Sequence, residues 1–280
     1  MSKHSATAMQ PKHQTQTVEP YGRQQTVPEQ VTYEQPLNER IRTLLRLEFL
    51  FAQANAHLYR HSNWDNRAAV NALFDIINVF GRTDLKTEIM KELERQALFL
   101  EKLAENPQVD KARLESVLDE MDILIDQLHG LKAQDMDIRN NDFLGSIKQR
   151  YHIAGGACDF DLPAYHFWLS RPQEQRILDM QQWLKPFDPI QQSVNLILRL
   201  IRDSAQTSRE IAEAGFFQKS LDPSSACQMI RVTLDGETPH FAEISGGKHR
   251  FTIRFMQTGF SDRPTQVDQD TPFKLTCCML

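Results

Sequence analysis

The chain has 280 residues, of which 40% are hydrophobic and 25% are charged. This composition allows one large or two modest domains with buried cores, so no metal or disulfide is needed to stabilise the fold. The formal net charge of -5 excludes a globally basic surface of the kind that holds nucleic acid or an anionic membrane, so an acidic partner must be bound by a local cluster of cations.

The four cysteines, Cys158, Cys227, Cys277 and Cys278, lack the density and spacing of a secreted disulfide framework, and they include no Cys-x-x-Cys pair. Residues 1–30 lack the apolar core of a signal peptide, and no run of about 18 apolar residues suggests a membrane span. We therefore expect a cytoplasmic protein with reduced thiols, no membrane contact, no metal and no cofactor.

The chain begins with a polar stretch. Residues 1–30 are rich in Gln, Thr, Pro and His, so they cannot bury enough apolar surface to offset the entropy of ordering, and we expect a disordered tail. Residues 31–36 are a candidate strand of the sheet domain described below. Asn38 is then a plausible cap for the first strong helix.

Helical periodicity dominates the next part of the sequence. Four amphipathic helices are predicted, and the last of them, over residues 114–131, has the cleanest spacing of apolar side chains. After a polar joint at 134–141, further helices continue to Ser204, with a break at Gly155-Gly156. We expect antiparallel packing in a mainly α-helical domain that spans residues 31–213.

The period changes to two from Gly215 onward. Residues 229–234 and 250–255 alternate apolar and polar side chains, and the turn signals Asp235-Gly236 and Gly246-Gly247 separate the strands. The sequence therefore predicts an antiparallel β-strand domain over residues 214–280. The expected fold class is α+β, with an N-terminal helix bundle and a C-terminal sheet domain that the extended segment 31–36 joins.

The strand at 250–255 presents two different faces. Phe251, Ile253 and Phe255 point one way, and Arg250 and Arg254 point the other. If the strand at 229–234 lies in the same sheet, Arg231 joins the arginine face. Such a face could bind an acidic peptide, although an ordinary solvated sheet surface explains the pattern equally well.

The helices carry two weaker basic candidates. Arg42 and Arg46 lie four residues apart on the first helix, but Glu39 and Glu48 could simply pair with them. The second candidate is a short basic segment that Asp142 interrupts. It contains Arg139, Lys148 and Arg150.

Catalytic and metal-binding interpretations fail on the chemistry that they require. Cys158 could act as a nucleophile with His152 or His166 as its base, but no oxyanion donor or orienting acid is identifiable. Gly246-Gly247-Lys248 lacks the spacing of a phosphate loop, and the adjacent pair Cys277-Cys278 lacks further metal ligands. We therefore assign no catalytic residue.

Several segments, taken together and in order, resemble the ZapD family of bacterial Z-ring-associated cell division proteins. They are residues 36–50 (PLNERIRTLLRLEFL), 91–96 (KELERQ), 155–163 (GGACDFDLP), 250–256 (RFTIRFM) and Cys277-Cys278. The resemblance implies a homodimer that binds the tubulin-like protein FtsZ, bundles its protofilaments, lowers its GTPase activity and lies at mid-cell in an FtsZ-dependent manner. It also implies that the protein has no catalytic chemistry.

The resemblance further implies a basic pocket for the C-terminal tail of FtsZ. The positions that carry over are Arg46, Arg82, His166, Arg250 and Arg254. One family arginine falls at Asp142 in this chain, so Arg139 or Lys148 is the expected substitute.

Two other functional classes stay open at this point. A basic sheet face with aromatic residues could hold single-stranded nucleic acid, although we expect Phe251 and Phe255 to face the core. An enzyme that uses Cys158 or Cys277 would lose its activity when the thiol is alkylated, whereas a binding protein would not.

Overall fold

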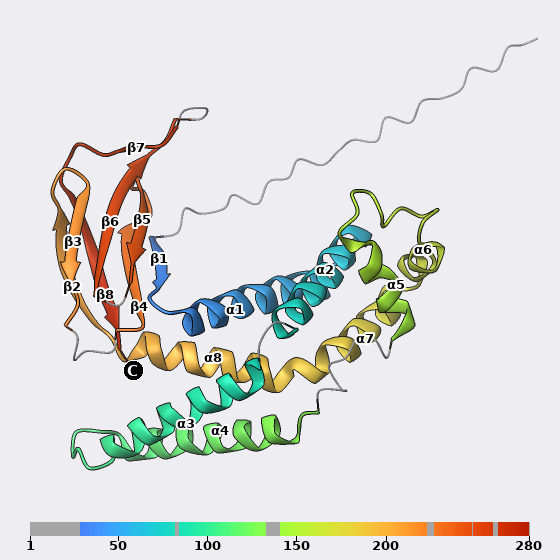
Figure 1. The fold of residues 1–280 in the computed structure, drawn as a ribbon, viewed down its shortest axis with the longest axis horizontal. Coiled ribbons are helices and arrows are strands. Elements are labelled where there is room, and N and C mark those ends of the chain that lie inside the picture. The colour runs from blue at the N-terminus through green and yellow to red at the C-terminus, as the bar shows by residue number, and fades with distance from the viewer. Residues whose placement is uncertain are drawn as a thin grey trace, which may run out of the picture.

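The computed structural model describes residues 29–81, 84–132, 141–222, 227–247, 249–259 and 263–279. It shows a helical part and two antiparallel sheets, which confirms the predicted α+β class (Figure 1). The helices are α1 (Glu39–Leu58), α2 (Asn63–Phe80), α3 (Leu85–Leu103), α4 (Lys111–Gly130), α5 (Asp142–Tyr151), α6 (Pro163–Ser170), α7 (Gln173–Leu184), the short 3-10 helix η2 (Lys185–Phe187) and α8 (Asp188–Asp203). The strands are β1 (Gln30–Pro36), β2 (Gln206–Ala212), β3 (Phe216–Ser220), β4 (Met229–Asp235), β5 (Phe241–Gly246), β6 (Arg250–Gln257), β7 (Thr265–Gln266) and β8 (Thr271–Cys278).

Helix α1 begins where the sequence predicts. The side chain of Asn38 accepts a hydrogen bond from the backbone N–H of Ile41 at 2.9 Å, which satisfies one of the free donors of the first turn. Its buried face packs against α2 and α8, and it includes Leu44, Leu47 and Phe51. The opposite face is left exposed beside β1.

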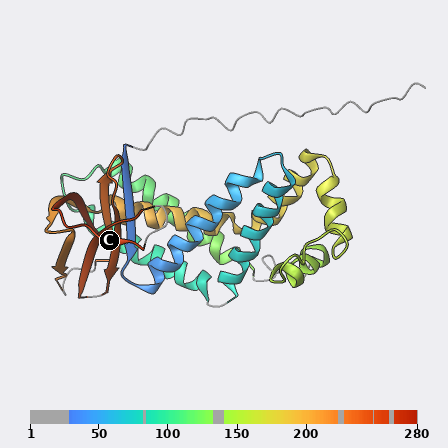
Figure 2. The same ribbon diagram turned by 90° about the horizontal axis from the view of Figure 1, so that it is seen from above.

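Helix α8 is the central element of the helical part. Ile190, Val194, Ile197 and Ile201 are fully buried along one face, and α8 contacts α1, α3 and α4. The α3–α4 hairpin lies along one side of α8, and α5 and α6 lie at the end of the molecule far from the sheets (Figures 1 and 2). Within the described residues, no helix is long and apolar enough to cross a membrane.

The strands form two sheets that enclose a second core. The orders are β1-β4-β8-β2 and β3-β6-β5, with β7 paired to the C-terminal end of β6, and all these pairings are antiparallel. Strand β1 pairs with β4, so the extended segment before α1 does join the sheet as predicted. The core between the sheets includes Ile230, Val232, Phe251, Ile253 and Phe255, which confirms that the two phenylalanines face inward.

Strand β2 differs from the sequence expectation, which begins the sheet only at Gly215. Most side chains of β2 are exposed, so the segment has no apolar alternation to reveal it. It is a strand because its backbone pairs with β8 from Gln206 to Ala212. The turn to β3 requires a glycine at 215, where φ is 71° and a Cβ would lie 2.5 Å from the carbonyl oxygen of Val267.

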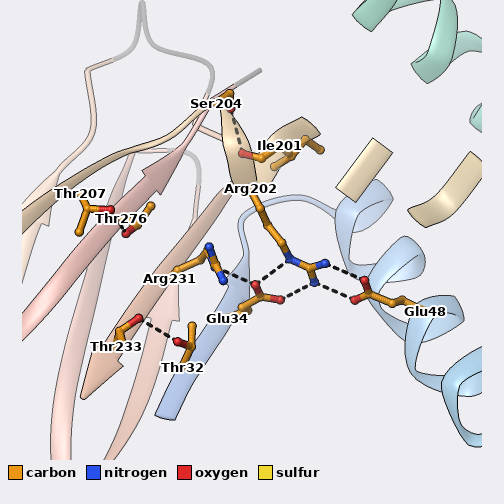
Figure 3. Close-up of polar contacts among 10 residues, drawn as sticks. All are labelled: Thr32, Glu34, Glu48, Ile201, Arg202, Ser204, Thr207, Arg231, Thr233 and Thr276. Atoms are coloured by element: carbon orange, nitrogen blue, oxygen red, sulfur yellow. Dashed lines mark hydrogen bonds and ion pairs between the residues drawn. The ribbon is translucent and has the colours of Figure 1, made fainter. Parts of the chain in front are cut away.

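Four charged side chains connect the sheet that contains β1 and β4 to the helices (Figure 3). The guanidinium of Arg202 on α8 donates to both carboxylate oxygens of Glu34 on β1, at 2.9 and 2.8 Å, and to both of Glu48 on α1, at 2.6 and 2.7 Å. Arg231 on β4 forms an ion pair with Glu34 at 2.9 Å. The pKa of Arg202 is raised, first by its hydrogen bonds to Glu48, so the cation stays charged at any relevant pH.

Candidate partner-binding surface

Arg46 lines a groove between β1, α1 and α2. The groove has a volume of about 690 Å³, and its apolar wall includes Leu45, Phe49 and Val79. Phe49 is 68% exposed, which is unusual for a large aromatic side chain beside a buried helix face. An exposed apolar surface bordered by arginines is the combination that a partly apolar, acidic peptide requires.

The charges of this groove are unequally neutralised. Two acids line it, but Glu34 pairs with Arg202 and Arg231, and Asp75 accepts a hydrogen bond from the hydroxyl of Tyr151 at 3.2 Å. Among the described residues, the cations that line it, Arg42 and Arg46, share one acid, Glu39, which lies outside the groove. The groove therefore offers two cations to a partner, beside the carboxylate of Asp75, which only a neutral hydroxyl contacts in the described part of the chain.

The pairing of the two α1 arginines is weak. Arg42 lies 3.1 Å from Glu39 and Arg46 lies 3.9 Å from the same carboxylate, and the side chain of Arg46 is 63% exposed. Exposed pairs of this kind contribute at most about 1 kcal/mol, so a carboxylate of a partner can replace Glu39. Glu48, the other expected partner, is instead engaged by Arg202.

His166 lies in a different cavity, at the far end of the helical part. This cavity has a volume of about 910 Å³ and is lined by α2, α5, α6 and the turn around Gly155-Gly156. Nδ1 of His166 lies 3.0 Å from the carboxylate of Asp159. A side chain at Gly156 would place its Cβ 2.7 Å from the carbonyl oxygen of Arg150, so the close turn that positions Asp159 depends on that glycine.

Arg67 is a functional candidate that the sequence interpretation missed. Its guanidinium lies 5.6 Å from the ring centroid of Trp64 and 4.9 Å from that of Tyr165, and it donates to the carbonyl oxygen of Ala157 at 2.9 Å. Burial raises the pKa of Tyr165 to about 12, and its hydroxyl has no hydrogen-bond partner among the described residues. The signal in the sequence was the Trp64-x-x-Arg67 spacing on one helix face.

The same cavity contains Cys158, the candidate nucleophile of the sequence analysis. Its thiol is exposed, and His166 contacts Asp159 rather than the sulfur in the described part of the chain. No hydrogen bond in that part connects a base with the thiol, so the arrangement lacks the contact that activates a catalytic cysteine.

Arg250 and Arg254 lie exposed on the outer face of the β3-β6-β5 sheet. Their cross-strand neighbours in register are Ser220 for Arg250, and Phe216 and Glu243 for Arg254. This face therefore carries an acid beside one of its two arginines. Neither guanidinium has a carboxylate within ion-pair distance among the residues that the structure describes.

Arg231 does not join that face, so the expectation of a shared row of cations is wrong. Strand β4, which carries Arg231, belongs to the other sheet, and the apolar sides of both sheets face the core between them. The outward side chains of β4 and β6 therefore point in opposite directions. Arg231 instead pairs with Glu34 at the junction with the helices.

The candidate residues thus occupy three separate places within one chain. Arg46 lies at the α1 groove, His166 at the α5–α6 end, and Arg250 and Arg254 on the sheet at the opposite end (Figure 1). Lys148 lies on α5 with a half-buried side chain. The two other candidates lie outside the described residues: Arg82 and Arg139.

Comparison with known proteins identifies the family. A family model for the cell division protein ZapD matches residues 45–254. The chain is 45% identical to the cell division protein ZapD of Methylococcus capsulatus over 252 residues, which is 90% of this chain and 99% of the relative. It is 39% identical over 251 residues to that of Aromatoleum aromaticum and 38% identical over 253 residues to that of Coxiella burnetii, with 89% of this chain and 98% of each relative covered. These relatives are named as cell division proteins and not as enzymes. This chain therefore belongs to the ZapD family of cell division proteins.

Proposed function

We propose that this chain is a division factor that binds the C-terminal tail of FtsZ and cross-links FtsZ protofilaments as a homodimer. The observation that carries the proposal is the α1 groove, where the apolar wall around Phe49 adjoins the half-buried Arg42 and the exposed Arg46, which pair only weakly with Glu39. An acidic tail with apolar side chains would replace Glu39 with its own carboxylates and cover Phe49.

Bundling follows from repetition of a weak contact. A single groove with exposed charges binds weakly, but a symmetric dimer presents two grooves and a filament displays many tails. Simultaneous contacts then add avidity without any new interaction. Bundled filaments would stabilise the division ring at mid-cell and hydrolyse GTP more slowly, and salt would weaken the bundles by screening the charges.

The remaining candidate residues belong to the proposal in distinct roles. Arg250 and Arg254 offer a second cationic surface for the tail or for the filament, and Lys148 on α5 and His166 on α6 are further proposed contacts. Arg231 acts indirectly, because it holds Glu34 on the rim of the α1 groove. Arg82 and Arg139 remain proposed tail contacts on the basis of the family resemblance alone.

The outer face of the β3-β6-β5 sheet does not favour single-stranded nucleic acid as its ligand. Stacking requires exposed aromatic rings, whereas Phe251 and Phe255 are buried between the sheets. The outer face beside Arg254 exposes only Phe216 in part, and Glu243 opposes a phosphate there.

Co-sedimentation with FtsZ polymerised in GTP tests the proposal. Full-length FtsZ and FtsZ without its C-terminal tail are compared at low and moderate salt. We expect tail-dependent pelleting that decreases with salt. Equal pelleting of both FtsZ forms would contradict the role of the tail, and no pelleting with a well-folded protein would contradict the proposal as a whole.

A charge-reversed variant tests the groove itself. Arg46→Glu should abolish pelleting. It replaces the more weakly paired cation of the groove by a carboxylate that, together with Glu39, repels an acidic tail. Arg113→Glu is the matched control, since Arg113 is also exposed but lies on α4. Identical pelleting of the two variants would place the tail elsewhere.

A further inference from the structure

Two thiols from distant parts of the sequence meet beside the core of the sheets. Cys227 lies two residues before β4, and Cys277 lies on β8, the antiparallel neighbour of β4, opposite Ile230. Both are half-buried and pack against the core between the sheets. The thiol of Cys227 donates to the carbonyl oxygen of Met229 at 3.7 Å, and the side chains of Cys227 and Cys277 interact electrostatically.

The other two cysteines are separated from this pair. Cys278 follows Cys277 on β8 but points to the opposite face, where it is fully buried in the helical core, and burial raises its pKa to about 11. Cys158 is exposed in the cavity between α5 and α6, at the far end of the molecule. All four thiols are free, so one reactive pair can be singled out by position.

The surroundings of the pair make its two members chemically different. The hydrogen bond from Cys227 lowers the pKa of Cys277 to about 7, and the ammonium of Lys219 acts in the same direction, while Glu210 and burial oppose it. The same hydrogen bond and burial raise the pKa of Cys227. Cys277 is therefore partly a thiolate near neutral pH, and Cys227 keeps its proton until Cys277 has reacted.

We propose that Cys277 and Cys227 form a dithiol site that reacts with small disulfides of the glutathione class and closes to a reversible protein disulfide. The thiolate of Cys277 attacks one sulfur of the small disulfide, whose S–S bond breaks and releases one small thiolate. Cys227 then loses its proton to solvent and attacks the sulfur of Cys277, which releases the second small thiolate. Two protein thiols are oxidised and one small disulfide is reduced to two thiols.

The fold places Cys227 near Cys277, so the second step, the attack of Cys227 on the sulfur of Cys277, requires little movement. Both thiols already pack against the same core, one on β8 and one just before its neighbour β4, and a disulfide requires the sulfurs to approach to about 2.05 Å. The backbone N–H of Gln228 donates to the carbonyl oxygen of Cys278 at 2.8 Å, which fixes the start of β4 against the end of β8. This site lies apart from the α1 groove, so the inference does not depend on the proposed function.

The test uses the reduced full-length protein in a series of reduced and oxidised glutathione ratios near neutral pH. Intact mass, thiol titration and peptide mapping follow the products. We expect the loss of two hydrogens, two remaining thiols, a peptide that links Cys227 to Cys277, and reversal by a dithiol reductant. A lasting glutathionyl group on Cys277, a link that includes Cys158 or Cys278, or no reaction would each overturn the proposal.

Variants distinguish the attack of Cys277 on the small disulfide from the formation of the Cys227–Cys277 disulfide. Cys227→Ala should accumulate one glutathionyl group on Cys277, and Cys158→Ser, the matched control, should close as the unaltered protein does. The rate of alkylation of Cys277 should rise through a midpoint at about pH 7, and this midpoint should increase in Cys227→Ala because the hydrogen-bond donor is lost. An unchanged pH midpoint of Cys277 alkylation in Cys227→Ala would contradict the roles assigned to the two cysteines. If this variant does not fold, the peptide map of the unaltered protein tests the proposal instead.

Discussion

At the scale of single residues, the buried carboxylate of Glu92 connects helices α1 and α3. Glu92 on α3 is 0% exposed and accepts hydrogen bonds from Arg40 on α1, from Arg95 at 2.6 and 3.0 Å, and from Gln96 at 2.9 Å. The sequence identified residues 91–96 only as part of a family resemblance. In the structure, this segment has an internal role, because its acid is the shared partner of cations from two helices.

Glu92→Gln tests this role. The amide keeps the shape of the side chain but leaves two guanidinium groups without their anion, so we expect a loss of about 2–4 kcal/mol in the free energy of unfolding. Glu94→Gln removes an exposed acid from the same helix and should change stability by less than about 0.5 kcal/mol. Urea unfolding of both variants gives the comparison, and equal stabilities would show that the buried charge contributes nothing net.

Contacts between residues that are close in the sequence could be predicted, whereas contacts between distant residues could not. Asn38 caps α1 through an N–H three residues away, and Arg46 approaches an acid seven residues away, so helical spacing predicts both. Arg202 contacts Glu34 and Glu48, which lie 168 and 154 positions away. No periodicity in the sequence encodes such a pair, and only the completed fold brings it together.

At the level of whole elements, alternation predicted strands and their buried faces but not their partners. The apolar sides of β4 and β6 are buried as expected. Which sheet a strand enters depends on backbone pairing between distant segments, and for this reason Arg231 and Arg254 were wrongly expected on one face. The pairing also explains why the mostly exposed β2 was missed.

Charge reversal on β6 tests the sheet surface. Arg250→Glu with Arg254→Glu should leave the fold intact, because both side chains are exposed, and should abolish FtsZ pelleting if this face binds the filament. The double variant Arg209→Glu with Lys274→Glu is the charge-matched control on the other sheet, where these residues are register partners. Pelleting by the folded β6 variant at the level of the control would remove the sheet surface from the proposed site.

Substitutions of glycine test the packing at the turn between β2 and β3, which connects the two sheets. Gly215→Ala should destabilise the protein by about 1–3 kcal/mol, because the residue has positive φ and its new methyl group would collide with Val267. Gly145→Ala in the middle of α5 has open space and should instead stabilise by up to about 1 kcal/mol. Thermal unfolding of both variants shows whether each substitution lowers or raises stability as expected. Stabilisation by both would contradict the predicted collision with Val267.

For the molecule as a whole, the junction in Figure 3 fixes the sheets against the helices. Arg202 and Arg231 together compensate Glu34 and Glu48, and the four residues come from α8, β4, β1 and α1. Because Glu34 also lines the α1 groove, the same contacts position the candidate binding surface.

Arg202→Met tests the junction. It leaves two part-buried carboxylates without their shared cation, and we expect a loss of about 2–3 kcal/mol, which lowers Tm by roughly 5–10 °C in a chain of this size. Arg199→Met on the same helix removes only an exposed pair with Glu120 and should cost less than about 1 kcal/mol. Calorimetry on both variants decides the point, and equal melting temperatures would exclude a stabilising junction.

The pairing of β1 with β4 has a consequence for synthesis on the ribosome. Thr32 and Thr233 hydrogen-bond across these strands although 201 positions separate them. Helix pairs that are close in the sequence, such as α1–α2 and α3–α4, can fold as they emerge, because local contacts form early and distant ones late. Strand β1, made first, must therefore wait with an unpaired edge until almost the whole chain has been translated. A nascent chain stalled before residue 229 would carry folded helices beside an open strand, the state in which chaperones would be needed most.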